Sequence, residues 1–242
     1  MKACVNYFKL LIYSRLPAWH ISCRLFSAQK YTRMKACFTI AILLVYVGCF
    51  AQQKTEKDFA VRNRTISITN DGGVQVIHLN DRDNDGVAWI NGEQFTQGSI
   101  EVDIKGKDVL QRSFVGIALH GVNDTTFEVI YFRPFNFRST DPARKAHAVQ
   151  YVALPGYDWP KLRSEHPNQY EKPIDPAPDP NEWFHARIEV SGSTIKVFVN
   201  NNTTPALIVD ELVHTNGKMV GYWVGNGSDG NWKNLKITRT ND

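Results

Sequence analysis

Residues 183–190 read Trp-Phe-His-Ala-Arg-Ile-Glu-Val, and residues 100–105 read Ile-Glu-Val-Asp-Ile-Lys. In an extended chain, alternate side chains point to opposite faces, so each stretch places its apolar residues on one face and its charged residues on the other. This period of two predicts strands that bury a single face, as in antiparallel sheets with one side toward a core.

The same alternation recurs along the chain between turns rich in Gly and Asn, such as residues 70–73, 191–193, 200–202 and 225–230. The further strands that it predicts are residues 65–69, 74–79, 87–90, 114–120, 126–137, 146–152, 195–199, 206–212, 218–224 and 235–238. No stretch reads as a long amphipathic helix. The sequence therefore predicts an all-β protein, a two-sheet antiparallel β-sandwich of the jelly-roll type.

Residues 34–51 have the features of a secretory signal peptide. Lys35 precedes an apolar run over residues 36–47, and Ala51 ends the segment before polar Gln52. Met34 opens a repeat of the first four residues, so residues 1–33 are interpreted as an over-long N-terminal extension. We expect cleavage after Ala51, which would release a domain over residues 52–242. This domain is expected in the periplasm, at the cell surface or outside the cell. The alternatives are a segment that is retained as a membrane anchor and a lipid attached to Cys49.

The charged residues and the cysteines are unevenly distributed. Residues 1–51 hold seven of the 28 basic residues and no acidic one, which leaves 21 basic against 24 acidic residues, a charge of −3, in the rest of the chain. A mildly acidic domain has no electrostatic footprint for nucleic acid. We expect no nucleic-acid partner and no membrane contact beyond the signal peptide. All four cysteines lie within the first 49 residues, so no disulfide is expected in the domain.

A proline-rich segment interrupts the strands. Eight of the 11 prolines lie between Pro142 and Pro180, and no strand is predicted between Val152 and Trp183. Long loops inside compact domains are usually functional or disordered. Because this one carries Tyr157, Trp159, His166 and Tyr170, it is interpreted as an ordered flap at the rim of a site.

The hairpin over residues 114–132 suggests a site. With a five-residue loop, Ala118 would stand opposite Glu128, and Gly116, Ala118, His120 and Glu128 would share one face. The two small residues would leave room for a sugar ring beside a histidine and a glutamate, which are the candidate catalytic pair. The alternative is a solvated outer face.

Neighbouring polar and aromatic side chains complete the candidate site. Arg133 and Asn136 are expected to continue the second hairpin strand, and His147 and Gln150 are expected on the next strand. For Arg133 the alternative is a structural role, in which a carboxylate or carbonyl of the protein binds its buried guanidinium. Aromatic rings can stack on sugar faces. The candidate substrate-binding residues are Arg133, Asn136, His147, Gln150, Tyr157, Trp159 and Trp223.

Other catalytic and metal motifs are incomplete or missing. The run Asp81-Arg82-Asp83-Asn84-Asp85-Gly86 opens like a calcium loop, but Gly92 stands where the closing carboxylate belongs. A polar turn is therefore favoured over calcium bound by Asp81, Asp83 and Asp85, and no metal or cofactor is expected. The paired acids of retaining glucanases, G-x-S-x-G, H-E-x-x-H and phosphate-binding loops are absent.

Four stretches resemble the concanavalin A-like lectin/glucanase superfamily and, within it, the 3-keto-disaccharide hydrolase-type domain of secreted bacterial proteins. They are residues 98–103, 114–129, 182–200 and 220–237. The resemblance implies a keto-glycoside substrate, with Glu128 or His120 as the base and Arg133 or His147 stabilising the oxyanion. His120 stands where that domain usually has Arg.

Two classes of function follow. The first is an enzyme that hydrolyses or eliminates a glycoside with Glu128 and His120 as acid and base, and the second is a noncatalytic carbohydrate-binding module. An enzyme needs this pair in a pocket with a perturbed environment, whereas a lectin needs only exposed aromatic rings and polar rims. In both cases the expected partner is a carbohydrate. A structural interaction module of the cell envelope is the third alternative.

Overall fold

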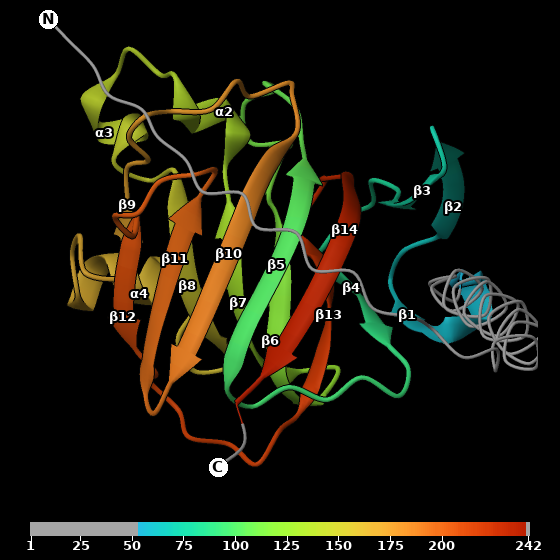
Figure 1. Cartoon of the computed structure of the whole chain (residues 1–242). Coiled ribbons are helices and arrows are strands. Elements are labelled where there is room, and N and C mark those ends of the chain that lie inside the picture. Colours follow the sequence, from blue (N-terminus) through green and yellow to red (C-terminus); the bar gives the residue numbers. More distant parts are fainter. Residues whose placement is uncertain (1–52, 241–242) are drawn as a thin grey trace, which may run out of the picture. The chain divides into compact units, whose positions relative to one another are not determined.

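A computed structural model describes residues 53–240, which form two antiparallel sheets of seven strands each. The predicted all-β sandwich is confirmed. The expectations for the extension and the signal peptide concern residues 1–51, which lie outside the described residues. Figure 1 shows one sheet in front of the other, with short helices at the upper and left margins.

We call the two layers sheet A and sheet B. Sheet A has the order β1-β4-β13-β6-β7-β8-β9, and sheet B has the order β12-β11-β10-β5-β14-β3-β2. The strands of sheet A are β1 (Phe59–Arg62), β4 (Gly86–Ile90), β13 (Met219–Val224), β6 (Val115–Asn123), β7 (Thr126–Phe132), β8 (Val149–Leu154) and β9 (Glu171–Lys172). Those of sheet B are β12 (Leu207–Asp210), β11 (Thr194–Val199), β10 (Phe184–Ser191), β5 (Gly98–Lys105), β14 (Gly230–Arg239), β3 (Val74–Leu79) and β2 (Ile66–Asp71).

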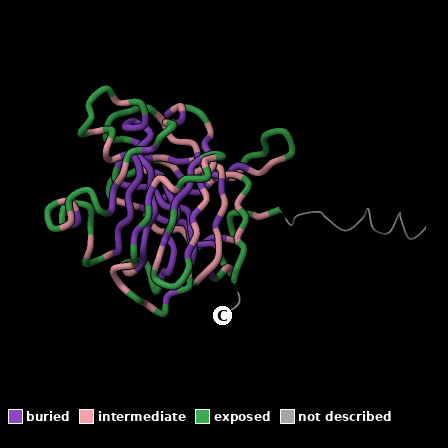
Figure 2. The backbone as a smooth tube through the Cα atoms, turned by 60° about the vertical axis from the view of Figure 1, so that its left-hand side comes forward, coloured by how far each residue is buried: buried purple, intermediate pink, exposed green. Residues whose placement is uncertain are grey.

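The core lies between the two sheets, as the predicted alternation requires. In sheet B, Ile104 pairs with Phe184 and Ile100 with Ile188, and all four side chains face inward and are buried. Aromatic contacts join the layers: the ring centroids of Phe132 and Phe184 are 5.0 Å apart. Figure 2 shows the buried residues concentrated inside the sandwich. Apolar burial on these inner faces is the main stabilising term.

The last two strands hold central positions. Strand β13 lies between β4 and β6 in sheet A, and β14 lies between β5 and β3 in sheet B. In sheet A, β1 and β4 are therefore connected to β6 only through β13. In sheet B, β2 and β3 are connected to β5 only through β14.

Short helices replace parts of the predicted strands and of the predicted loop. The described residues include η1 (Glu56–Asp58), α2 (Pro134–Phe137), α3 (Pro142–Lys145) and α4 (Trp159–Glu165). The predicted strand over residues 126–137 ends at Phe132, because Pro134 lacks a backbone N–H and suits the first turn of a helix. Helix α4 begins after Asp158, whose carboxylate accepts a hydrogen bond from Lys161 N at 3.1 Å.

The predicted register of the β6–β7 hairpin is wrong by one residue. Leu119, not Ala118, stands opposite Glu128, and the ladder is interrupted between Leu119 and Asn123. His120 lies in this β-bulge with φ = 51°, a left-handed conformation that non-glycine residues seldom adopt. Glu128 consequently shares the inner face of sheet A with Ile130, whereas Ala118 is on the outer face.

Candidate functional site

His120, Glu128 and Glu211 meet between the two sheets at one end of the sandwich; we call them the interior cluster. His120 Nδ1 lies 3.2 Å from Glu128 Oε2 and 3.2 Å from Glu211 Oε1. Glu211 directly follows β12, so the cluster joins sheet A to a segment leaving sheet B. The sequence correctly predicted that His120 and Glu128 are neighbours. Glu211 was not predicted, because no local pattern connects it to the hairpin.

Burial and mutual charge control the ionisation of this cluster. Burial alone would lower the pKa of His120, but the hydrogen bond and charge of Glu128, with the charge of Glu211, raise it above its ordinary value. Burial, followed by repulsion from Glu128, raises the pKa of Glu211. The neighbouring Tyr151 Oη accepts a hydrogen bond from Leu212 N at 3.1 Å, and burial raises the pKa of this phenol.

His120 and Glu128 do not lie in the open groove that was predicted under the flap. Only 8% of the His120 side chain and 2% of the Glu128 side chain are exposed. The predicted sheet floor is also closed: a Cβ on Gly116 would lie 2.1 Å from Ile130 O. The ring centroids of Tyr131 and Trp223 lie 5.1 Å apart, and both side chains are buried.

A second polar group, the Glu171 cluster, is centred on the buried carboxylate of Glu171. Arg163 donates to both of its oxygens at 2.9 and 2.7 Å, and His147 Nδ1 lies 2.8 Å from Oε1. Arg133 Nη1 is 3.7 Å from Oε2. Figure 1 shows the strand and helix that supply this cluster, β9 and α4, on the same side of the molecule.

The protein itself occupies most hydrogen-bonding groups of the Glu171 cluster. Arg133 donates to Tyr131 Oη at 2.7 Å, to His147 O at 3.0 Å and to Gln150 Oε1. Arg133 does not continue β7 but precedes α2, which contains Asn136. Asn136 donates to His147 O at 3.1 Å. The structure thus brings four predicted binding residues together, in an arrangement that fits the structural alternative for Arg133.

His147, like Arg163, is a partly exposed member of the Glu171 cluster. Burial lowers the pKa of its imidazole, and the charges of Arg163 and Arg133 add to that effect against the attraction of Glu171. Because Nδ1 faces the Glu171 carboxylate, which only accepts, the neutral imidazole carries its proton on Nδ1, and Nε2 can accept one hydrogen bond from a ligand.

The three predicted stacking residues differ in exposure. Trp159 is 49% exposed, and the Arg163 guanidinium lies 5.0 Å from its ring centroid. Tyr157 is half-buried and pairs through its backbone with Ala153. Trp223 is only 7% exposed, which leaves its ring no open face for a sugar. Trp159 is therefore the predicted aromatic residue best placed for stacking.

The acidic turn before β4 is held by protein contacts. Asp85 accepts a hydrogen bond from Arg62 at 2.9 Å, and Asn63 donates to the main-chain oxygens of Asp83 and Asp85 at 2.8 and 2.9 Å. Over residues 53–240, Asp81, Asp83 and Asp85 do not gather their carboxylates into a metal-type group. These contacts fit the predicted polar turn.

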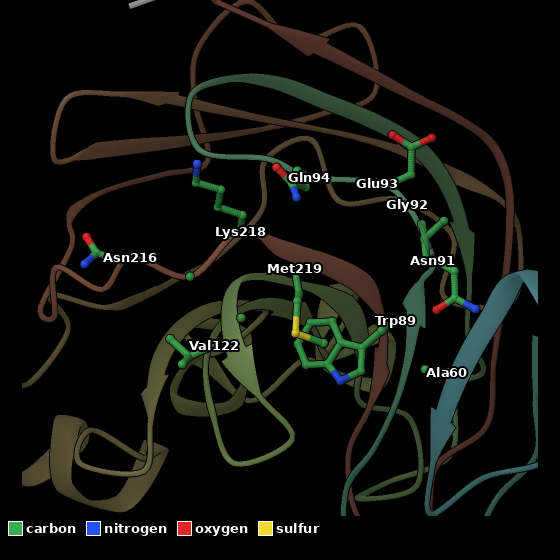
Figure 3. Close-up of a pocket in the computed structure, with 13 residues that line it drawn as sticks. Ala60, Trp89, Asn91, Gly92, Glu93, Gln94, Val122, Asn216, Lys218 and Met219 are labelled. Atoms are coloured by element: carbon green, nitrogen blue, oxygen red, sulfur yellow. The ribbon is translucent and has the colours of Figure 1, made fainter.

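A cleft of about 660 Å³ opens at one end of the sandwich, beside the interior cluster. We call it the end cleft, and Figure 3 shows its lining. Loops contribute Asn91, Glu93, Gln94, Asn216 and Lys218, while Trp89, Val122 and Met219 supply apolar surface. This cleft was not predicted from the sequence. Its one local signal is a pair of Asn-Gly turns at residues 91–92 and 216–217, typical of tight loops.

The end cleft and the interior cluster share supporting residues. Gly121, in the lining, follows His120, and Thr215 Oγ1 donates to His120 O at 3.2 Å. Phe95 N donates to Lys218 O at 2.9 Å, and the Phe95 ring stacks on His120 with centroids 6.0 Å apart. A shift of His120 would therefore move the loops that line the end cleft, because Thr215 and Phe95 contact both.

No protein-family model and no curated protein sequence matches this chain. Solved structures do match. A carbohydrate-binding module, CBM66, from Bacillus subtilis is 16% identical with a TM-score of 0.52, over 74% of this chain and 93% of that one. A functionally unknown protein from Saccharomyces cerevisiae is 13% identical with a TM-score of 0.50, over 78% of this chain and all of that one.

These similarities, with the two seven-stranded sheets, define the class of the fold: it is the concanavalin A-like sandwich of lectins and glucanases. At such low identity the likeness identifies the fold alone. Within residues 53–240, no helix has the length and apolar character needed to cross a membrane.

Proposed function

We propose that this protein is a carbohydrate-binding domain that holds its ligand in the end cleft. The observation that carries the proposal is the lining of the cleft, where five polar side chains surround apolar surface from Val122 and Met219 above the buried Trp89. Ligand sites commonly occupy about 300–1,000 Å³ and combine apolar surface with a few placed polar groups. The cleft falls within this range.

The chemistry of the lining suits a sugar. Each sugar hydroxyl both donates and accepts hydrogen bonds, and the amides of Asn91, Gln94 and Asn216 can do the same, while Lys218 only donates and an ionised Glu93 only accepts. The three residues are exposed; the Asn91 amide already donates to Lys57 O at 3.1 Å, which orients its oxygen as an acceptor. The structural similarity to a carbohydrate-binding module further supports this class of ligand.

A competing binding surface lies at α4. The exposed ring of Trp159 can stack on a sugar, with Arg163 and His147 beside it. This patch retains part of the site predicted from the sequence. It lacks the enclosure of the end cleft, so we place it second.

The catalytic alternative assigns acid–base chemistry on a keto-glycoside to Glu128 and His120. A general base must come within about 2.6–3.2 Å of the proton that it removes, directly or through one water. Both side chains are buried between the sheets and do not line the end cleft. Turnover would require the linker after β12 to move aside, and for this reason the geometry favours binding over catalysis.

The test is a glycan-array screen of the purified protein, followed by calorimetric titration of the best glycan. We expect Gln94→Ala and Asn216→Ala each to weaken binding by roughly 3- to 10-fold, the value of one net hydrogen bond. Trp159→Ala should bind like the wild type. Loss of binding in Trp159→Ala alone would place the site at α4, and the absence of any bound glycan would refute the proposal.

Product analysis in the same experiment addresses the catalytic alternative. We expect no released sugar from bound glycans or from keto-glycosides. Turnover that disappears in Glu128→Gln, with folding intact, would instead establish the enzyme.

A further inference from the structure

The interior cluster has the composition and spacing of a metal site. His120 Nδ1, one oxygen of Glu128 and one oxygen of Glu211 all lie within 4.8 Å of one another. They come from the β6 bulge, from β7 and from the residue after β12. Three segments far apart in the chain thus present one ligand atom each to the same point.

Within residues 53–240, no lysine or arginine forms an ion pair with the two carboxylates at this point. In the described part of the chain, the ion-pair partners of Glu128 and Glu211 are His120 and, for Glu211, also the exposed His214. The Glu128 side chain is 2% exposed, and its Oε1 has no hydrogen-bond partner. Glu211 Oε1 also lacks one. Two carboxylates in such surroundings carry a large desolvation cost unless a cation joins them.

The histidine is oriented as a ligand would be. Its Nε2 lies 2.9 Å from the main-chain oxygen of Thr96. A carbonyl oxygen only accepts, so Nε2 carries a proton, and Nδ1 faces both carboxylates. Without a metal, a second proton on Nδ1 can join the ring to Glu128 through their hydrogen bond; a metal ion that replaces this proton would take the Nδ1 lone pair and one oxygen from each carboxylate. Metal-bound histidines commonly donate their other ring N–H to a carbonyl in this way.

The ligand types, together with two of the three spacings, favour a small transition-metal ion. Bonds of about 2.0–2.1 Å place the ligands of a tetrahedral ion about 3.3 Å apart. The two Nδ1–oxygen distances of 3.2 Å match this value, and all three ligand atoms lie within 4.8 Å of one another, so the carboxylate oxygens would move closer together on binding. One imidazole and two carboxylates suit zinc or manganese, whereas calcium prefers six to eight oxygen ligands.

We propose that His120, Glu128 and Glu211 bind one divalent transition-metal ion of the zinc or manganese type. The ion joins sheet A to the linker that leaves β12 and crosses to β13. Since residues 216–219 of that linker also line the end cleft, metal binding holds the rim of the cleft in place.

The experiment measures metal content and stability in protein produced without a histidine tag. After treatment with EDTA and dialysis, the wild type is titrated with Zn²⁺, Mn²⁺, Mg²⁺ or Ca²⁺ in a calorimeter and melted with and without each ion. We expect about one equivalent of Zn²⁺ or Mn²⁺ and a rise in Tm with that ion. Mg²⁺ and Ca²⁺ should have little effect.

Glu211→Gln and Glu128→Gln keep the side-chain shape and should weaken binding at least about 100-fold, because each removes an anionic ligand. His185→Asn is the matched control: it removes a histidine that lies 2.8 Å from Asp103 outside the cluster, and it should bind like the wild type. A wild type that takes up no ion and shows no shift in Tm overturns the proposal whatever the variants do. Stoichiometric binding that is unchanged in both glutamine variants also overturns it.

Discussion

Glu171 is a carboxylate almost without access to water, and three cationic or titratable side chains depend on it. Removing one member of a buried charge group commonly costs about 3–5 kcal/mol, because the remaining charge stays in the interior. Arg133 is the member at risk, since it is only 5% exposed. We therefore predict that Glu171→Gln lowers the free energy of unfolding by about 3 kcal/mol, as measured by urea denaturation.

Asp179→Asn provides the control for this prediction. It removes an ion pair with Arg138 at 2.8 Å in which the two side chains are 56% and 41% exposed. Exposed pairs contribute about 0–1 kcal/mol, so we expect a loss below about 0.5 kcal/mol. Equal losses in the two variants would contradict a special role for the buried carboxylate.

Some site residues could be predicted from the sequence because their chemistry is local. An arginine among aromatic residues needs a partner, and the structure supplies Gln150 and Glu171. The environment of Glu128 could not be predicted, because it depends on Glu211, which lies 83 positions further along the chain. Contacts between distant segments leave no periodic pattern to detect.

At the level of elements, alternation predicted the regular strands well. The pairs Ile104–Phe184 and Ile100–Ile188 follow directly from two stretches with strict period two. The hairpin failed because a β-bulge inserts residues that a simple count from the turn does not include. A non-glycine residue, His120, occupies the left-handed position, so no local signal marked the bulge. Strand β1 was missed because its sequence, Phe59-Ala60-Val61-Arg62, has three apolar residues in a row and no alternation.

Gly217 tests how tightly the linker packs against this bulge. A Cβ at this position would lie 2.1 Å from His120 O and 2.6 Å from His120 C, and neither backbone atom can rotate away. Overpacking commonly costs about 1–3 kcal/mol. We predict that Gly217→Ala lowers the free energy of unfolding by about 2 kcal/mol, as measured by thermal denaturation.

Gly156→Ala is the companion variant, because a Cβ there would meet nothing within 4 Å. Replacing an unstrained glycine stiffens the unfolded chain, so this change should be neutral or stabilise by up to about 1 kcal/mol. If Gly217→Ala were equally harmless, the bulge and the linker would have to be more loosely packed than the structure indicates.

At the level of the whole molecule, we propose that the domain is exported after its leader is removed. The apolar run over residues 36–47 and the small residue Ala51 motivate this proposal. We predict that protein recovered outside the cytoplasm begins at Gln52, as determined by N-terminal sequencing. Soluble cytoplasmic protein that retains Met1 would contradict the proposal.

The central placement of β13 and β14 has a consequence for how the chain is made. Without residues 219–239, β1 and β4 would be separated from β6, and β2 and β3 would be separated from β5. Neither layer can be completed on the ribosome before the final segment has emerged, and pairings between such distant segments form slowly. A premature stop near the C-terminus should therefore yield fragments that are degraded or aggregate. The same delay would keep the nascent chain unfolded for threading through a translocation pore, as the proposed export requires.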